Sequence, residues 1–391
     1  MSAPETMVLA DVVASWPLKL TYIDTRWSLP ANARYPLTLD SDDVCNLLRR
    51  CTRLRSVTLF ATEEVAAVLA AMTTPAHRLQ KLHLAYEGTL TLDWATLLQP
   101  WLSSGHARHV SFNKAPAADM AGLARALATT SSLRSLAILE NDALIRAFLA
   151  LRMPLHQLTK LHLSTHRSKL LRQFLKLCAL ASLTSFALDC YASFATVTLF
   201  VSHMPALRHL SLGFCFFGAD ADDASRWPHL ESIEFCDVDF GSGARDAVLA
   251  YLARVQGLQK MSFDHCYTLC RPFVGLSRTL VRLINDGLTL ASFESTALDD
   301  VDASHLALVL RRSRNLLPFT LNVMGDDFTM VGIRTLLLAL ATCASVCIKI
   351  DISPYCFEEE IEAFLAAHGM SSVLENASSY ALYSPSRVLE A

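Results

Sequence analysis

Apolar residues recur along the chain in one short pattern, in which positions 1, 4 and 6 are apolar. The clearest copy runs from Leu133 to Asn141 and reads L-x-x-L-x-L-x-x-N. Because side chains alternate between the two faces of a strand, each copy predicts a β-strand whose positions 1, 4 and 6 enter the core. Positions 3, 5 and 7 then point outward, and positions 2 and 8 flank them. Further copies start at Leu54, Leu79, Ala107, Leu158, Leu183, Leu207, Leu230, Leu258, Leu288 and Leu316, and an ambiguous one covers Val346 to Ile350.

The mean spacing between copies is about 26 residues, which leaves room for a helix between successive strands. Several intervening segments are rich in Ala, Leu and Arg and nearly free of Gly and Pro, as expected of helices. The exception is Gly218 to Pro228, which is short and acidic and predicts a loop or a single turn. The predicted helical segments are Glu64 to Met72, Ala118 to Ala128, Leu144 to Leu151, Lys169 to Leu180, Ala244 to Val255 and Val331 to Thr342.

The two ends of the chain depart from the pattern, as terminal units of a repeat array do because they close its apolar ends. Residues 1–53 predict a cap with decayed repeats, with strand fragments at Leu18-Lys19-Leu20 and Leu37-Thr38-Leu39 and a helix from Asp42 to Arg50. Residues 54–353 form the array of about twelve repeats. Residues 354–391 predict a second cap, in which a helix ends before Gly369 and a Ser-rich, partly ordered tail follows.

The pattern from about residue 54 to 350 resembles leucine-rich repeats of the ribonuclease-inhibitor-like and cysteine-containing kinds. The resemblance implies an α/β solenoid curved into a horseshoe, with a parallel sheet on the concave face and helices on the convex face. It also implies that the ninth position holds Asn or Cys, whose side chain satisfies backbone groups in the turn. Asn141, Cys215, Cys266 and Thr296 fit this rule, whereas His166, Tyr191, Val238 and Met324 depart from it.

Composition indicates a folded protein, since 52% of the residues are apolar and only 18% are charged. The formal net charge of −3 favours neither nucleic acid nor a membrane as partner. No secretory signal is evident, and the uncharged stretch from Thr335 to Ile348 is too short to span a bilayer. We therefore expect a soluble monomer, cytoplasmic or nuclear, whose eleven cysteines are reduced core residues.

Charged residues at the outward and flanking positions separate along the array. In the first five copies they are basic except for Glu140, and in copies six to ten they are mostly acidic. The basic set comprises Arg55, Lys81, Arg108, Lys114, Arg134 and Lys160, with His83, His109 and His162 beside them. The later set comprises Asp189, Glu231, Glu234, Asp237, Asp264 and Glu294, with Arg208 and Lys260 among them.

Two interpretations of this pattern remain open. A concave face that is basic at one end and acidic at the other would orient an elongated partner of opposite polarity. Alternatively, exposed strand positions simply need polar residues, and the order of signs has no function. Phe60, Tyr86 and Phe214 at positions 7 and 8 are candidate contact anchors, or else they pack against neighbouring repeats.

Short motifs for catalysis or metal binding occur only in incomplete form. Asp239-Phe240-Gly241 lacks the other kinase signatures, and Asp246 stands where a dinucleotide fingerprint following Gly241 needs its third glycine. His83 and His109 lie on adjacent repeats and are expected to approach each other, but a third metal ligand is missing. The sequence therefore predicts neither an enzyme nor a bound cofactor or metal.

Together these features predict a non-enzymatic scaffold that binds a protein partner on its concave face. Two alternatives come from the resemblance. One is a substrate-recognition subunit of a ubiquitin ligase, although residues 1–50 show no F-box pattern. The other is a GTPase-activating protein like the Ran-directed family, whose long acidic tail and Asn-rich edge are not visible in this chain.

Overall fold

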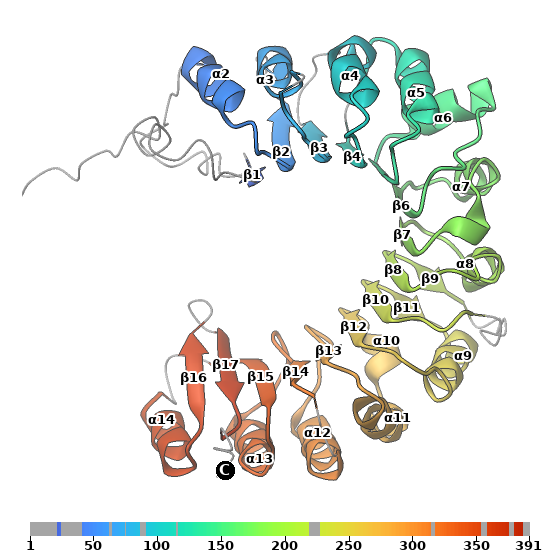
Figure 1. The fold of residues 1–391 in the computed structure, drawn as a ribbon. Helices are drawn as coiled ribbons and strands as arrows, with labels where there is room; N and C mark the ends of the chain where they lie inside the picture. The colour runs from blue at the N-terminus through green and yellow to red at the C-terminus, as the bar shows by residue number, and fades with distance from the viewer. Residues whose placement is uncertain are drawn as a thin grey trace, which may run out of the picture. The chain divides into compact units, whose positions relative to one another are not determined.

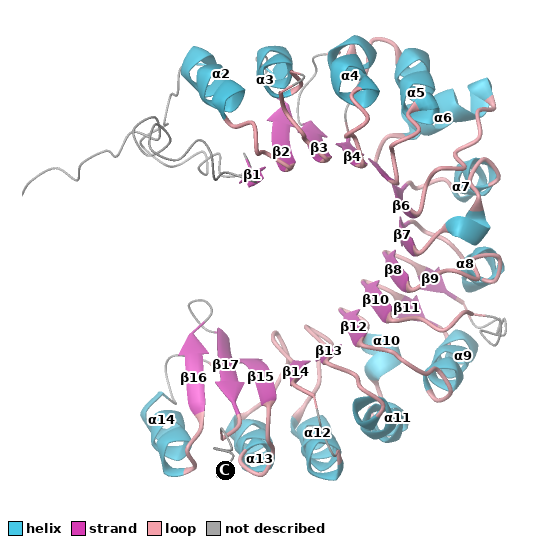
Figure 2. Ribbon diagram, viewed as in Figure 1, coloured by secondary structure: helices cyan, strands magenta, loops and turns pink. Residues whose placement is uncertain are grey.

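The computed structural model divides the chain into two compact units, residues 1–183 (unit 1) and residues 184–391 (unit 2). In each unit the strands line one side and the helices the other, as Figures 1 and 2 show. The residues that the structure describes are 22–24, 41–61, 65–74, 76–86, 91–114, 116–218, 227–313, 317–352, 358–374 and 379–385.

Unit 1 contains a parallel sheet whose strands follow the order of the chain, with a helix after each strand. The strands are β1 (Tyr22–Asp24), β2 (Ser56–Ala61), β3 (Lys81–Tyr86), β4 (His109–Asn113), β5 (Ser135–Leu139) and β6 (Lys160–Ser164). The helices are α2 (Ser41–Arg50), α3 (Val65–Met72), α4 (Trp94–Ser103), α5 (Met120–Thr129), α6 (Asp142–Leu151) and α7 (Ser168–Leu175), followed by the 3-10 turn η2 (Leu180–Ser182).

Unit 2 continues the same alternation and ends in an antiparallel hairpin. Its sheet is ordered β7 (Ser185–Asp189), β8 (His209–Gly213), β10 (Ser232–Cys236), β12 (Lys260–Asp264), β13 (Leu290–Ser292), β14 (Phe319–Asn322), β15 (Val346–Asp351), β17 (Ser379–Tyr383) and β16 (Ser371–Leu374). A second small sheet pairs β9 (Phe216–Phe217) with β11 (Asp239–Phe240). The helices are α8 (Phe194–Val201), α9 (Ser242–Leu252), α10 (Tyr267–Cys270), α11 (Val274–Asn285), α12 (Asp300–Arg312), α13 (Met330–Leu340) and α14 (Glu358–Ala367).

Strand pairing confirms the predicted register of the first ten copies, because residues at position 4 lie opposite one another. In unit 1 Val57, Leu82, Val110, Leu136 and Leu161 pair in turn. In unit 2 Phe186, Leu210, Ile233, Met261 and Ala291 do the same. Positions 1, 4 and 6 of these ten copies are all buried, so the strands supply a continuous apolar layer beneath the helices. Each unit is thus an α/β leucine-rich repeat solenoid.

Position 8 of many copies has a left-handed backbone, with φ between 49° and 55°. This conformation turns the chain out of the strand and brings position 9 back under the sheet. Non-glycine residues adopt it rarely, so its recurrence at one position marks a constraint of the repeat. The residues concerned are Lys114, Glu140, Phe214, Asp237, His265 and Ser295.

The predicted register of the copy at Leu316 is wrong by two residues. Ala291, at position 4 of the preceding copy, pairs with Leu321 and not with Phe319. Val323, predicted to flank the outward positions, is fully buried. Gly325 takes the left-handed conformation of position 8, with φ of 72°. The ninth position is therefore Asp326, where the sequence had indicated Met324.

Side-chain caps fix the starts of several helices close to the predicted places. Asp93, Asp119 and Asn141 each accept a hydrogen bond from the backbone N–H three residues ahead, at 3.1, 2.8 and 3.1 Å. Asp299 begins α12 with a reciprocal capping box. The helices predicted from Ala, Leu and Arg content are confirmed as α3, α5, α6, α7, α9 and α13.

The ends of the array agree with the predictions only in part. Helix α2 and helix α14 are confirmed, and Gly369 beyond α14 has φ of 65°. The segment predicted as a Ser-rich tail instead forms β16 and β17, and β17 covers the edge of β15 by antiparallel pairing. The fragments at Leu18 and Leu37, and most of the loop predicted from Gly218 to Pro228, lie outside the described residues.

Candidate functional site

The outward surface of each sheet, made by positions 3, 5 and 7, is called the sheet face below. On the sheet face of unit 1, strand pairing gathers the predicted basic residues into two rows. Lys81, His109, Ser135 and Lys160 lie side by side at position 3. Position 5 contributes His83 and His162, with Ser111 and Ala137 between them. Lys81 and Lys160 are exposed, and the three histidines are half-buried.

His109 lies at the centre of this group. Its ring centroid is 4.5 Å from that of His83, which confirms the predicted approach of the two histidines. Its Nδ1 lies 2.6 Å from the Ser135 hydroxyl, while its buried Nε2 has no hydrogen-bond partner among the described residues. Burial, followed by the positive charges of His83, Lys81, Lys160 and His162, lowers the pKa of His109 to about 4. His109 is therefore neutral at physiological pH.

The arginines predicted for the partner-binding face have structural contacts in the repeat. Arg55 Nη1 donates to the carbonyl oxygen of Arg78 at 3.3 Å. Arg108 Nη1 donates to the Ser132 carbonyl at 3.2 Å, and Arg134 Nη1 to the Ser131 carbonyl at 2.7 Å. The acceptors of Arg55 and Arg108 belong to the turn before a neighbouring strand, so these two side chains join adjacent repeats, whereas Ser131 belongs to the turn before the strand of Arg134 itself. The arginines remain exposed, but part of their hydrogen-bonding capacity is used within the fold.

The flanking pair at position 8 is neutralised internally. Lys114 Nζ lies 3.2 Å from Glu140 Oε2, and both side chains are about half exposed. A pair this exposed contributes little to stability, but it removes net charge from the edge of the sheet. On the sheet face, Lys81 on β3 and Lys160 on β6 take part in none of the ion pairs among the described residues.

Unit 2 gathers carboxylates along position 7 of its sheet face. Asp189, Asp264 and Glu294 occupy this position, with Gly213 and Cys236 between them. A Cβ atom at Gly213 would lie 2.3 Å from Asp189 Oδ1, so a larger residue there would displace the Asp189 carboxylate from its present position. The pKa of the exposed Cys236 thiol is raised by partial burial and then by Asp237, Asp264 and Asp189. The carboxylates of Asp237, Asp264 and Asp189 therefore lie close enough together to affect the same thiol.

Hydroxyl and amide groups hold the carboxylates of this row in place. Asp264 accepts hydrogen bonds from the hydroxyls of Ser262 (2.6 Å) and Ser292 (2.7 Å). Asn322 Nδ2 donates to Glu294 Oε2 at 3.2 Å and to the Ser292 hydroxyl at 3.1 Å. The row is thus a connected network that presents fixed acceptors.

A hollow of about 230 Å³ opens on the same sheet face, above β7, β8, β10 and β12. It forms because small serines occupy outward positions on three neighbouring strands. Two acids rim it: Glu231 accepts from Arg208 Nη1 at 2.7 Å, and Glu234 accepts from the Ser232 hydroxyl at 3.1 Å. The lining residues are Ser185, Phe186, His209, Leu210, Ser211, Glu231, Ser232, Glu234, Gln259 and Lys260.

Aromatic side chains stand exposed at the carboxyl end of β7 and β8. Phe214 is 53% exposed, as expected of a contact anchor and not of a packed residue. Tyr191 (66% exposed) and Phe216 (60% exposed) join it, and sequence reasoning missed both. The sequence did contain an indication for Tyr191, because this residue replaces the usual Asn or Cys of the ninth position. The side chains of Phe60 and Tyr86 lie outside the described residues.

The ninth-position residues fill their predicted structural role. The thiol of Cys215 donates to the carbonyls of Cys190 and Gly213, and that of Cys266 to those of Phe235 and Asp264. Burial raises the pKa of each thiol to about 12, so both are unreactive. Asn141 caps α6, and the Thr296 hydroxyl donates to the Phe293 carbonyl at 2.8 Å.

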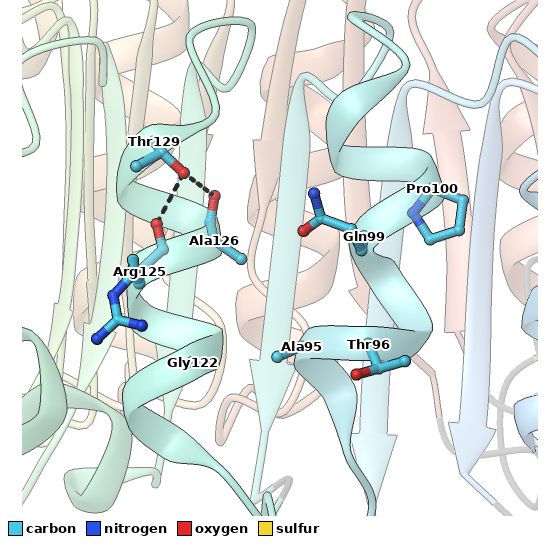
Figure 3. Close-up of a pocket in the computed structure, with 8 residues that line it drawn as sticks. All are labelled: Ala95, Thr96, Gln99, Pro100, Gly122, Arg125, Ala126 and Thr129. Carbon is cyan, nitrogen blue, oxygen red and sulfur yellow. Dashed lines mark hydrogen bonds between the residues drawn. The ribbon is translucent and has the colours of Figure 1, made fainter.

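The helix side of unit 1 carries a separate hollow of about 570 Å³ between α4 and α5 (Figure 3). Small residues such as Ala95, Gly122 and Ala126 leave this space between the two helices unfilled. The Thr129 hydroxyl is occupied by bonds to the carbonyls of Arg125 and Ala126, and Arg125 is the one ionisable side chain of the lining. This hollow offers no convergent polar groups for chemistry.

The described residues contain no cluster of three or more His, Cys, Asp or Glu side chains placed to hold a metal ion. Among the described helices, none has the length and apolar character needed to cross a membrane.

No family model and no curated protein matches the sequence. Several solved structures are similar in part, and two of them illustrate the extent of the likeness. An internalin (InlF) from Listeria monocytogenes aligns over 89% of this chain and 95% of its own, with 11% identity and a TM-score of 0.36. TLR13, in a complex with the single-stranded RNA ssRNA13, aligns over 80% of this chain and 55% of its own, with 12% identity and a TM-score of 0.30. Function is accordingly inferred from the residues of this chain.

Proposed function

We propose that the chain is a non-enzymatic recognition protein whose sheet faces bind a protein partner. The sheet face of unit 1 would contact acidic segments of the partner. The sheet face of unit 2 would contact segments that carry basic side chains or that pack against its exposed aromatic residues. We also infer the ribonuclease-inhibitor-like subtype, since a helix rather than an extended turn returns the chain after most strands.

The observation that carries this proposal is the gathering of like charges on each sheet face. In unit 1, burial and then the positive charges of His83, Lys81, Lys160 and His162 depress the pKa of His109. In unit 2, partial burial and then the charges of Asp237, Asp264 and Asp189 raise the pKa of the Cys236 thiol. Like charges held close together disfavour the folded state, so a partner of opposite charge would relieve a cost that folding alone does not explain.

Exposed aromatic residues support the same conclusion for unit 2. Tyr191, Phe214 and Phe216 lie beside the acidic row, and large rigid side chains of this kind commonly anchor protein interfaces. The combination of apolar anchors and fixed carboxylates suits a segment that carries both apolar and basic side chains.

Partner capture from cell extract followed by mass spectrometry tests the proposal when charge-reversed baits are compared. The sheet-face bait carries Lys81→Glu and Lys160→Glu, whose side chains are exposed and take part in none of the ion pairs among the described residues. The matched control carries Arg125→Glu on α5 and Lys169→Glu on α7, which changes the net charge equally on the helix side. Circular dichroism establishes that all baits are folded.

We expect some proteins to be captured equally by the unmodified chain and the helix-side control. The sheet-face variant should capture at least tenfold less of these proteins. Equal retention by all three baits would contradict recognition through the sheet face of unit 1. The identity of the retained proteins separates the remaining alternatives. A cullin with its adaptor indicates a ubiquitin-ligase subunit, and a small GTPase indicates a GTPase activator.

A further inference from the structure

The sheet face of unit 1 presents cations on both sides of a strand with small side chains. Lys81 and His83 lie on β3, and Lys160 and His162 lie on β6. Between them β4 presents the neutral His109, and β5 presents Ser135 and Ala137. Strands β3 and β6 are roughly 14 Å apart at the usual strand spacing, a gap that the long side chains of Lys81 and Lys160 can narrow from both sides around one tetrahedral anion.

The two lysines of this group are not neutralised by acids on the same strands. Positions 3, 5 and 7 of β3 to β6 hold no Asp or Glu. Glu140, at position 8 after β5, is paired with Lys114. None of the ion pairs among the described residues involves Lys81 or Lys160. The two ammonium groups therefore remain available to an anion of another molecule.

His109 gives the site a polar floor. Its ring is pinned through Nδ1 to the Ser135 hydroxyl, and its buried Nε2 lacks a protein partner among the described residues. The adjoining ring of His83 lies 4.5 Å away, close enough for the two imidazoles to repel each other once both are charged. A bound dianion would offset this repulsion, because a negative charge stabilises the charged form of each neighbouring imidazole.

We infer that Lys81, His83, Lys160 and His162, arranged around His109, bind a phosphoryl group carried by the protein partner. This inference rests on the recognition function proposed above and names the chemistry that the face of unit 1 recognises. Binding is non-covalent: the phosphoryl oxygens accept hydrogen bonds from ammonium and imidazole N–H groups.

A phosphoryl group fits this arrangement better than a carboxylate does. It has about −1.5 to −2 charges and three acceptor oxygens, so several separated donors can contact it at once. A planar carboxylate is typically bound by the fork of an arginine, and Arg55, Arg108 and Arg134 instead donate to backbone carbonyls. The cations left on the face are lysines and histidines, which act as separate point donors.

A protein segment is favoured over nucleic acid as the carrier of this group. Proteins that bind single-stranded nucleic acid combine basic grooves with aromatic platforms for the bases. The outward positions 3, 5 and 7 of β3 to β6 contain no Phe, Tyr or Trp. The cations are also confined to one small area, which suits a single phosphoryl group better than a phosphate backbone.

Nuclear magnetic resonance of the histidine ring signals tests the inference on the full chain. Inorganic phosphate is titrated first, against sodium chloride at equal ionic strength. A capped Gly-phosphoserine-Gly peptide and its unphosphorylated form follow. We expect saturable shifts of His83, His109 and His162 with phosphate and the phosphopeptide only, while the exposed His203 of unit 2 stays unchanged. The apparent pKa of His109 should rise when the anion is bound, because a nearby negative charge favours the imidazolium.

Matched variants separate this site from general charge effects. Lys81→Gln with Lys160→Gln should weaken phosphopeptide binding by tenfold or more, whereas Arg125→Gln with Lys169→Gln on the helix side should leave it unchanged. Shifts that sodium chloride reproduces would overturn the inference. So would binding of inorganic phosphate without binding of the phosphopeptide, or tighter binding of a single-stranded oligonucleotide than of the phosphopeptide.

Failure of this inference can be told apart from failure of the proposed function. If phosphatase treatment of the extract releases the partner that depends on Lys81 and Lys160, both conclusions stand. If the partner is retained after phosphatase treatment, recognition through the sheet face stands and the phosphoryl inference is overturned.

Discussion

At the scale of single residues, side chains of similar charge have different roles at different positions of the repeat. At some positions they bond within the fold, and at others they are exposed on the sheet face. Arg108 lies on the edge of the sheet and bonds a carbonyl of a neighbouring repeat, while Lys81 reaches solvent from position 3. Asp264 is held by two serine hydroxyls on the sheet face. Asp326 lies in the turn, where its Oδ1 accepts from the backbone N–H groups of Thr296 (2.8 Å) and Leu298 (3.2 Å).

Asp326 should make the stability of the protein depend on pH. Burial raises its pKa from 3.8 to about 7, and its buried Oδ2 has no hydrogen-bond partner among the described residues. The folded state thus keeps a proton that the unfolded chain loses above about pH 4. The free energy of unfolding therefore contains a contribution that is full below pH 4 and is lost as the pH rises through 7.

Asp326→Asn keeps the acceptor oxygen and removes the titration. We expect the variant to exceed the unmodified protein in free energy of unfolding by roughly 1 to 3 kcal/mol at pH 8, and by much less at pH 5. Urea denaturation at the two pH values measures the difference. Glu362→Gln, at an exposed residue of α14, is the control and should show no such trend. A benefit of equal size at both pH values would contradict this role of Asp326.

At the scale of strands and helices, much of the fold follows from the spacing of apolar residues. Leu133, Leu136 and Ile138 fixed the register of their repeat because each residue is needed in the core. The prediction failed for the copy at Leu316 because apolar residues also occupy positions 1, 4 and 6 of a register that starts two residues too early. These residues are Leu316, Phe319 and Leu321. Strands β16 and β17 were missed because the serines between residues 371 and 391 suggested a tail, and because the pairing of β17 with β15 depends on contacts between residues distant in the sequence.

The corrected register of β14 can be tested by substitution. Val323→Asp places an unpaired carboxylate in the core and should lower the free energy of unfolding by at least about 3 kcal/mol. Met324→Asp, one residue further and only half-buried, should cost roughly 1 kcal/mol or less. Urea denaturation of the two variants at pH 8 decides the register. A larger loss for Met324→Asp would restore the register that starts at Leu316.

The candidate site was only partly accessible from the sequence. The approach of His83 to His109 followed from their places on adjacent repeats. The contacts of Arg55 with a backbone carbonyl did not, because strand periodicity gives the side of the sheet and not the direction of a long side chain. The hollow of unit 2 arises only when Ser185, Ser211 and Ser232 stand together, so no single copy of the motif reveals it.

At the scale of the whole molecule, the residues that hold the repeats together differ from those that remain available to a partner. Buried leucines, phenylalanines and ninth-position side chains stabilise the solenoid of each unit. The outward positions carry charges that contribute little to that stability. Unit 1 presents cations and unit 2 presents carboxylates beside exposed aromatic residues, so binding should depend strongly on ionic strength.

The rate of association with a captured partner tests this central claim most directly. It would be measured between about 50 and 300 mM sodium chloride for the unmodified chain, the sheet-face variant Lys81→Glu/Lys160→Glu and the helix-side variant Arg125→Glu/Lys169→Glu. We predict that the sheet-face variant associates at least tenfold more slowly at low salt and loses most of the salt dependence, while the helix-side variant matches the unmodified chain. Equal rates and equal salt dependence for both variants would contradict recognition through the sheet face.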